Sequence, residues 1–201
     1  MAFLARAQIE TRAAELWRRR GLEVGFDAES LLDDLGLGLL WEGIAEDPGS
    51  RVLGALRPDA ALVVLNENRI GELEASEGLR RFTLGHEIGH WLLHAADARA
   101  GTLPLDPTGR TWCRSGSPAQ PERQAEMFAA SLLAPEDQVR ASLPPARDGG
   151  WAEVYSLAQT FRMTPTAMLI RLEELGLVHR DLAGAPVPGR RRDERQGTLF
   201  G

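Results

Sequence analysis

Residues 81–94 read Arg81-Phe-Thr-Leu-Gly-His-Glu-Ile-Gly-His-Trp-Leu-Leu-His94 and contain the pattern H-E-x-x-H at positions 86–90. Apolar residues recur at helical spacing around that pattern, which predicts an amphipathic helix over 77–94. At 3.6 residues per turn, His86 and His90 project from one face of such a helix, one turn apart. Two imidazoles so placed can bind one metal ion, and H-E-x-x-H on a helix is typical of zinc hydrolases.

Glu87 lies between the two histidines, beside the coordination position that such a site keeps open. There a carboxylate can take a proton from the attacking water, whose pKa zinc lowers to about 7, and pass it to a leaving amine. We therefore expect hydrolysis of a peptide bond. The alternative is a chance match in which the histidines lie in a core. Gly85 and Gly89 argue against chance, because glycine costs a helix roughly 0.5–1 kcal/mol relative to alanine and so suggests close approach by another segment or by substrate.

Two histidines leave zinc short of a ligand, so another segment must supply a third. The metzincin pattern requires glycine at 93 and histidine at 96, and this chain has Leu93 and Ala96 there. Glu122 is a better candidate, because it lies in a segment whose apolar residues predict a second packed helix. Pro121 opens that helix and Pro135 closes it.

Glu126 lies four residues after Glu122 and shares its helix face. We assign Glu122 as the third zinc ligand. We assign Glu126 as a carboxylate that hydrogen-bonds a ligand histidine at the ring nitrogen that does not bind zinc. For each of them a plain surface position is the alternative. His94, one turn beyond His90, falls beyond the metal's reach, and we expect it to support a ligand from behind or to lie at the surface.

The two segments together resemble the ImmA/IrrE metallopeptidases, also called the domain of unknown function 955 group. The second segment reads Glu122-x-x-Ala-Glu-x-Phe-Ala-Ala-x-Leu-Leu-Ala-Pro135, similar to the family's E-x-x-A-N-x-F-A-A-x-L-L-M-P. Glu126 stands where the family has asparagine, and Ala134 stands where it has methionine. The resemblance covers most of the chain. It implies a regulatory protease, often encoded beside a helix-turn-helix repressor that it cleaves to switch on genes after DNA damage or phage attack.

The lone cysteine, Cys113, falls between His90 and Glu122 in a stretch rich in turn formers, and a single cysteine excludes an intrachain disulfide. A thiolate is a strong zinc ligand at about 2.3 Å, and Arg110 and Arg114 would favour the thiolate. We therefore expect a cysteine switch in which Cys113 is an inhibitory fourth ligand at rest; the alternative is an ordinary unreactive thiol. The cysteine also makes the chain resemble, within the family, the CapP-type regulators of CBASS anti-phage operons, which act on a CapH-type repressor and respond to single-stranded DNA.

The remaining pattern predicts an α+β fold in which a small N-terminal sheet with helices precedes the active-site helix, in the manner of the gluzincins. An exposed sheet edge beside a zinc cleft can hold an extended peptide by strand addition. We assign residues 1–148 to this zinc metallopeptidase domain. Its expected elements are a helix over 3–20 that ends at Gly21, a short helix over 29–35, and strands over 36–41, 51–56 and 61–65.

After proline and glycine breaks, residues 157–177 read as helix, turn, helix, and we expect a helix-turn-helix-like subdomain over 149–180. Thr164 can cap its second helix, with Pro165 at the first helical position. Arginines in this unit are opposed by Glu173 and Glu174, so we favour packing against the peptidase domain over reading a DNA groove.

Tyr155 and His179, from the same segment, are candidate donors to the oxyanion of the transition state, with packing or surface exposure as the alternative for each. Residues 181–201 carry proline, glycine and a basic run and predict a disordered tail. Its last part, Gln196-Gly-Thr-Leu-Phe200, resembles short peptides that dock on the bacterial sliding clamp.

Composition sets limits on these assignments. The chain has 201 residues, of which 43% are hydrophobic, enough for one packed domain and a small appendage. It shows no apolar run of about 18 residues and no signal-peptide pattern, so we expect a cytoplasmic location without a membrane partner. The net charge is −6, yet all 23 basic residues are arginine. The arginine clusters at 18–20, 80–81 and 190–192 could bind DNA, or they are solvated faces.

The sequence therefore leads to a zinc endopeptidase, of the general class EC 3.4.24, that cleaves a protein regulator. The regulator that the resemblance implies is a helix-turn-helix repressor, with single-stranded DNA as the activator. One alternative is a DNA-binding regulator with a structural metal site. The other is a toxin-antitoxin type of interaction protein in which the metal is vestigial, although Glu87 would then have no purpose.

Overall fold

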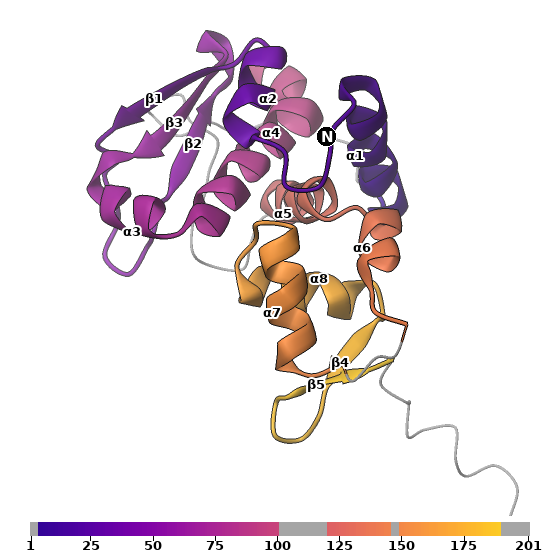
Figure 1. The fold of residues 1–201 in the computed structure, drawn as a ribbon. Helices are drawn as coiled ribbons and strands as arrows, with labels where there is room; N and C mark the ends of the chain where they lie inside the picture. The colour runs from indigo at the N-terminus through magenta and orange to yellow at the C-terminus, as the bar shows by residue number, and fades with distance from the viewer. Residues whose placement is uncertain (1–3, 101–119, 146–148, 190–201) are drawn as a thin grey trace, which may run out of the picture.

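The computed structural model describes residues 4–100, 120–145 and 149–189 of the chain. Within these ranges the fold is mixed α+β and mostly helical, with eight α-helices and a small sheet (Figure 1). The coarse fold class predicted from the sequence is confirmed. No helix in the described ranges has both the length and the apolar character needed to cross a membrane.

Two helices begin the chain, α1 (Arg6–Arg20) and α2 (Ala28–Asp34). Gly21 ends α1 with a φ of 59°, and its N–H donates to the carbonyl of Trp17. This left-handed conformation favours glycine, which confirms the predicted end of the helix. The face of α1 that lies in the core repeats at helical spacing and consists of Ile9, Ala13, Leu16 and Trp17.

A three-stranded sheet follows, with strand order β1-β3-β2. Its strands are β1 (Gly38–Glu42), β2 (Gly54–Arg57) and β3 (Leu62–Asn66), with β1 parallel and β2 antiparallel to β3. All three strands were expected, with boundaries one to three residues earlier. The central strand buries a run of apolar side chains because both of its faces are covered. The two edges of this sheet are therefore β1 and β2, a point that the sequence left open.

Helix α4 (Glu77–Arg99) begins where the sequence predicted and extends past the expected end at His94. It packs on the sheet and on α5 (Gln120–Leu133), the helix predicted over 121–135. Four short helices were not predicted: η1 (Pro58–Ala60), η2 (Glu67–Arg69), α3 (Ile70–Ala75) and, after α5, α6 (Glu136–Ser142).

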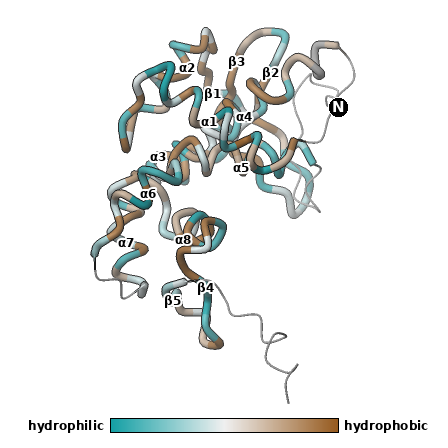
Figure 2. Tube along the Cα trace, turned by 90° about the vertical axis from the view of Figure 1, so that its right-hand side faces the viewer, coloured by the Kyte–Doolittle hydropathy of each residue, from teal (hydrophilic) through white to brown (hydrophobic). Residues whose placement is uncertain are grey.

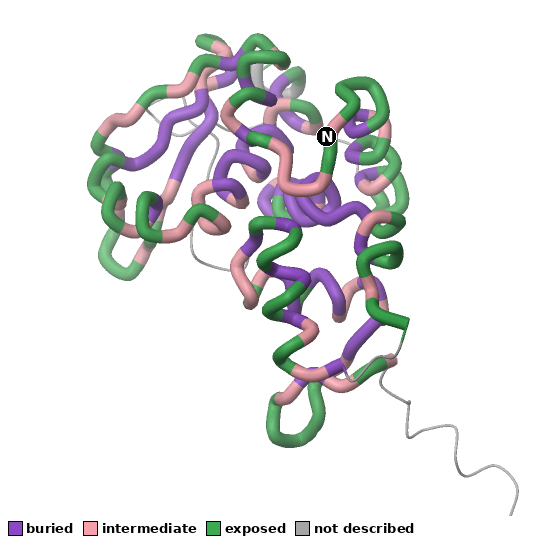
Figure 3. Tube along the Cα trace, viewed as in Figure 1, coloured by how far each residue is buried: buried purple, intermediate pink, exposed green. Residues whose placement is uncertain are grey.

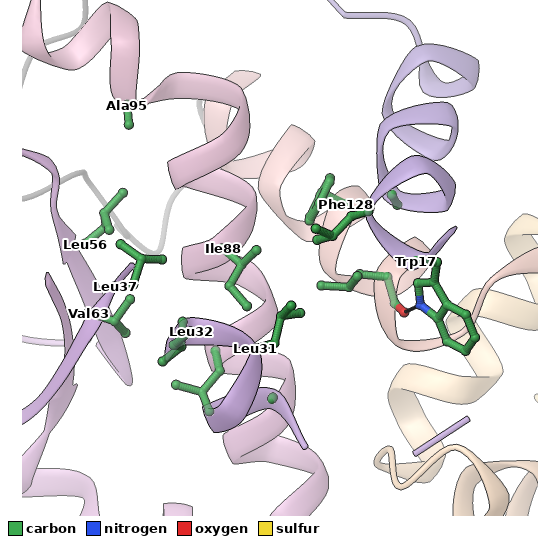
Figure 4. Packing of buried hydrophobic residues seen from close by; sticks show 14 of the residues in the cluster. Trp17, Leu31, Leu32, Leu37, Leu56, Val63, Ile88, Ala95 and Phe128 are labelled. Carbon is green, nitrogen blue, oxygen red and sulfur yellow. Dashed lines mark hydrogen bonds between the residues drawn. The ribbon is translucent and has the colours of Figure 1, made fainter. Parts of the chain in front are cut away.

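One apolar core joins the sheet, α4, α5 and α1. Figure 4 shows Val63 of the sheet, Ile88 of α4, Phe128 of α5 and Trp17 of α1 along this core, and Figure 3 shows α5 and β3 as largely buried segments. The indole Nε1 of Trp17 donates to the carbonyl of Leu132 at 2.6 Å, across 115 positions in the sequence. The first and fifth helices are thus held together by a polar contact as well as by apolar packing.

A second core holds the C-terminal part, which comprises α6 (Glu136–Ser142), α7 (Trp151–Thr160), α8 (Pro165–Glu174) and a two-stranded hairpin. Figures 1 and 2 agree that α7, α8 and the hairpin lie on the side of α5 away from the sheet. The hydroxyl of Thr164 accepts from the N–H of Ala167, and Pro165 is the first residue of α8. Both features were predicted from the sequence.

Two arginines connect this part to the rest of the molecule. The guanidinium of Arg171 on α8 is 1% exposed, donates to the carbonyl of Ala134 at 2.9 Å and pairs with Glu10 of α1 at 3.0 Å. Arg162 donates to the carbonyl of Gly25 at 2.8 Å and pairs with Glu77 at the start of α4. Arg180 on the hairpin pairs with Glu173 of α8 at 2.9 Å, so all three arginines of the predicted helix-turn-helix-like unit make contacts within the chain.

The predicted disordered tail begins too early. Residues 181–189 complete the hairpin, in which β5 (Pro186–Pro188) pairs antiparallel with β4 (Val178–Arg180). Asp181 accepts from two turn N–H groups, at 2.9 and 2.8 Å. Prolines are tolerated on edge strands, and a two-stranded hairpin has only edges, which is why Pro186 and Pro188 do not prevent pairing. Residues 190–201, with the clamp-like sequence, lie outside the described residues.

Candidate metal centre

The H-E-x-x-H pattern lies within α4. His86 and His90 are one turn apart, with ring centroids separated by 4.6 Å and Nε2 atoms separated by 3.0 Å. His90 is fully buried, and the side chain of His86 is 12% exposed. The two imidazoles therefore present their Nε2 atoms to one point on the surface of the helix.

Glu122, in the first turn of α5, completes the group. Its Oε2 lies 3.2 Å from Nε2 of His86, and its Oε1 lies 3.3 Å from Nε2 of His90. The ligand atoms of all three residues lie within 4.8 Å of one another, and each residue is buried. Within the described residues, these three are the one group of histidine, cysteine and carboxylate side chains that meets this description. Two imidazoles and a carboxylate form a donor set that zinc accepts, so the residues present fit this metal.

The two glycines of the motif explain why α5 comes so close to α4. A Cβ added at Gly89 would lie 3.0 Å from Cα of Ala125, and one added at Gly85 would lie 3.4 Å from Cβ of Ala129. The close approach predicted from these glycines is therefore made by another segment of the chain, the helix that carries Glu122. A larger residue at position 89 would press on the backbone of α5.

Glu87 points from the same helix toward the sheet. It is 1% exposed, and a Cβ built at Gly54 on β2 would lie 3.5 Å from its Oε1 and 2.8 Å from Cγ2 of Thr83. Glycine at position 54 thus lets an edge strand pass directly over the part of α4 that carries this carboxylate. Sequence analysis did not identify Gly54, because its importance depends on a contact between segments.

The charges around the group favour a bound cation. Burial works to lower the pKa of His86, but its hydrogen bond with Glu122 and the negative charges of Glu87, Glu122 and Glu126 outweigh burial and raise that pKa. Burial works to raise the pKa of Glu122, but hydrogen bonds with His86 and His90 lower it to about 2. Glu122 is therefore an anion throughout the physiological pH range, as a metal ligand must be.

His94 lies two turns beyond His86 on α4 and does not belong to the three-residue group. It is 2% exposed, and its Nε2 lies 3.2 Å from the carbonyl oxygen of Pro121. The sequence left two possibilities for His94, a hydrogen bond that supports a metal ligand or a place at the surface. A surface position is wrong, because α5 covers α4 at this point.

Other residues singled out by the sequence lie elsewhere. Glu126 is exposed on α5, and its hydrogen bond to a ligand histidine stays a prediction. Tyr155 is 56% exposed on α7, where its ring contacts Trp151 at 5.9 Å, and His179 on β4 contacts the carbonyl of Gly189 at 3.1 Å. The structure does not bring these two to the three donors in the described residues, and their role as oxyanion donors stays a prediction. Cys113 lies outside the described residues.

A cavity of about 700 Å³ lies between α5, α8 and the start of α1. Phe82 and Glu126 line it, each one turn along its helix from His86 and from Glu122 respectively. Met127, Ala167 and Ile170 give it apolar walls. A space of this size and composition next to the three donors can hold several groups of a bound chain. It was not predicted, because the sequence does not show that α8 packs beside α5.

Comparisons with known proteins agree with this geometry. The sequence profile described as the IrrE N-terminal-like domain, the M78 peptidase family, matches residues 64–173, which run from β3 into α8 and contain all three donors. No curated protein matches the sequence. Among solved structures, a Mycobacterium tuberculosis transcriptional regulator shares the fold at a TM-score of 0.54 and 16% identity, over 92% of this chain and 55% of that one. The chain thus spans about half the length of that protein.

Proposed function

This chain belongs to the IrrE N-terminal-like family of M78 peptidases, and we propose that it is a zinc-dependent endopeptidase of the gluzincin type with α4 as its active-site helix. One observation carries the proposal. His86, His90 and Glu122, from two helices that are separate in sequence, place their ligand atoms within 4.8 Å of one another, next to the buried carboxylate of Glu87. A structural role would not require that neighbouring acid.

The three donors would hold the zinc ion through Nε2 of each histidine and the carboxylate of Glu122. Bound zinc would supply Lewis acidity, which activates water and polarises a carbonyl group. Glu87 then accepts the proton of the attacking water and delivers it to the leaving amine. Its burial between α4 and β2 keeps its carboxylate in one place and away from bulk solvent.

A protein substrate fits the surroundings of the group better than a small molecule does. The edge strand β2 passes beside Glu87, and the cavity lined by Phe82, Glu126 and α8 begins one helical turn from His86 and from Glu122. An extended peptide can pair with a strand edge while its side chains enter neighbouring spaces. On the resemblance to the CapP-type regulators, we propose a helix-turn-helix repressor as substrate, single-stranded DNA as activator and a cytoplasmic location. The fold likeness to a transcriptional regulator is compatible with a role in gene control.

The domain organisation and the cysteine switch are part of the same proposal. We assign the metallopeptidase domain to residues 1–148 and a helical subdomain to 149–180, with Cys113 as an inhibitory zinc ligand at rest. X-ray absorption at the zinc edge, on wild type and Cys113→Ser, tests the switch. A single sulfur near 2.3 Å that disappears in the variant supports it, and a shell of nitrogen and oxygen alone in wild type rejects it.

The DNA-binding alternative is less well supported by the contacts of its own arginines. Arg171 is buried against α5 and α1, and Arg162 is engaged with Gly25 and Glu77. Neither guanidinium is free to contact a DNA backbone without breaking a contact within the chain. A helix that reads a groove instead needs exposed basic or polar side chains.

The main test compares Glu87→Gln with wild type on a library of peptides, with cut products identified by mass spectrometry. We expect both proteins to bind one zinc ion, and only wild type to cut peptides, in a manner that a chelator stops. The matched control is Glu74→Gln, the same change at an exposed position on α3, which should cut like wild type. Equal cleavage by wild type and Glu87→Gln would show that the activity comes from a contaminant and would reject the proposal.

A further inference from the structure

His94 is a buried histidine that the proposed chemistry does not use. It is 2% exposed and faces the start of α5, where its Nε2 lies 3.2 Å from the carbonyl oxygen of Pro121. A carbonyl can only accept a hydrogen bond, so Nε2 carries the hydrogen and donates it. The ring of His94 is 5.5 Å from that of His90, so the contact is made directly beside the group of donors.

The position of Pro121 gives this contact its importance. Helix α5 begins at Gln120, so Pro121 and Glu122 both lie in its first turn. The ends of helices open more easily than their middles, and a ligand in a first turn depends on whatever holds that turn in place. One turn further along α5, Ala125 packs closely against α4, because position 89 of α4 is a glycine. Glu122 therefore lies between two contacts with α4, a packing contact at Ala125 and a hydrogen bond at Pro121.

We propose that His94 is the positioning residue for Glu122: its hydrogen bond to Pro121 holds the first turn of α5 so that the carboxylate meets the two histidines. This inference rests on the proposed function, because it concerns the affinity of the zinc site. Three histidines on one face of α4 then have two roles, in which His86 and His90 bind the ion and His94 places the third ligand. Loss of such a partner behind a ligand typically weakens metal binding by 10–100-fold.

The test measures the zinc Kd by competition with a chelator, together with the visible spectrum of the protein loaded with Co²⁺. His94→Phe fills the space but cannot donate, and we expect a zinc Kd about 10–100-fold higher and a changed Co²⁺ spectrum. His94→Gln has an amide nitrogen that can reach the same carbonyl, and it should restore most of the affinity. If His94→Phe does not fold, His94→Met, which also lacks a donor, replaces it in the comparison.

Trp17→Phe is the matched control, because it also removes a ring N–H that donates to a backbone carbonyl of α5. Its partner, Leu132, lies at the opposite end of that helix from Glu122. We expect this variant to lower the melting temperature and to leave the zinc Kd and the Co²⁺ spectrum unchanged. If His94→Phe behaves in the same way, then His94 is a packing residue and the proposal is wrong.

A double-mutant cycle shows whether His94 acts through Glu122. In a Glu122→Ala background, adding His94→Phe should cause no further loss of Co²⁺ affinity, because the group that His94 positions is gone. An equal loss with and without Glu122 would overturn the proposal. Wild type that binds neither ion would instead overturn the proposed function, and this inference with it, from a measurement that involves no variant.

Discussion

Charged side chains are buried at both ends of α5, but they are arranged differently at each end. At its first turn, against α4, the side chains of His86, His90 and Glu122 converge so that their ligand atoms lie within 4.8 Å of one another. At its other end, the guanidinium of Arg171 is 1% exposed, and its partners are divided between two nitrogens: Nε donates to the carbonyl of Ala134, and Nη1 pairs with Glu10 and Glu174. Burial of a charge does not by itself mark a functional site; convergence of lone pairs on one point does.

Glu122→Ala should disrupt the three-donor group at the first turn of α5 and give the largest effect of the variants considered. The zinc Kd should rise by more than the roughly 10–100-fold that loss of a residue behind a ligand causes, because a direct ligand is removed. The metal-free protein should stay folded, since the variant removes a buried anion without opening the apolar core. Chelator competition and thermal unfolding check the two statements, and an unchanged Kd would show that Glu122 is not a ligand.

Arg171→Met should remove the buried contacts at the far end of α5 and leave the three-donor group intact. The carbonyl of Ala134 loses its donor, and Glu10 and Glu174 lose a partner, although both acids are about a quarter exposed and can be hydrated. We expect a loss of about 2–3 kcal/mol in the free energy of unfolding, somewhat less than the roughly 3–5 kcal/mol for breaking a fully buried ion pair, because water can hydrate the two acids. Urea unfolding measures the loss, and the zinc Kd should equal that of wild type. A raised Kd would contradict the independence of the two ends of α5.

Alanine substitutions at Gly85 and Gly89 test whether the close packing of α4 against α5 is needed for stability and for zinc binding. Gly89→Ala places a Cβ 3.0 Å from the backbone of Ala125, whereas Gly85→Ala places one at an ordinary 3.4 Å from Cβ of Ala129. The first should cost about 1–2 kcal/mol net, because crowding outweighs the gain in helix propensity, and should weaken zinc binding. The second should be neutral or slightly stabilising. If urea unfolding gave the same free-energy change for both variants, the close approach of α5 at position 89 would not limit stability.

Glu46→Gln tests a partly buried charge outside the metal centre, for which we expect the smallest effect. Hydrogen bonds from Arg69 and from the N–H of Val52 lower the pKa of Glu46 from 4.5 to about 2. A carboxyl whose pKa is lower in the folded state stabilises above its unfolded pKa and loses that contribution as the pH falls through the folded one. Wild type should therefore melt slightly above the variant at pH 6, and the difference should vanish toward pH 2. A difference that grew on acidification would contradict the assignment.

Much of the site could be predicted because its information is local. His86 and His90 follow from helical spacing, Glu87 from the motif, and Glu122 from a second helical pattern bounded by Pro121 and Pro135. The ends of α1 and α8 were also predicted, because Gly21 and Thr164 act through their immediate neighbours.

The parts that could not be predicted depend on which segments meet. The contact of His94 with Pro121 and the passage of Gly54 over Glu87 each join segments from different elements. The hairpin of β4 and β5 was missed for another reason: its strands have three residues each, and one contains two prolines, so no period-2 pattern can be seen.

The hydrogen bond between Trp17 and Leu132 also has a consequence for synthesis on the ribosome. Helix α5 is held by α1, which precedes it in the chain, and α5 supplies the third donor of the group. A nascent chain that has emerged only through His90 carries two donors and the acid, but it lacks Glu122. The order of the chain thus keeps the growing polypeptide from assembling its three-donor site until α5 has been made and can dock against α4.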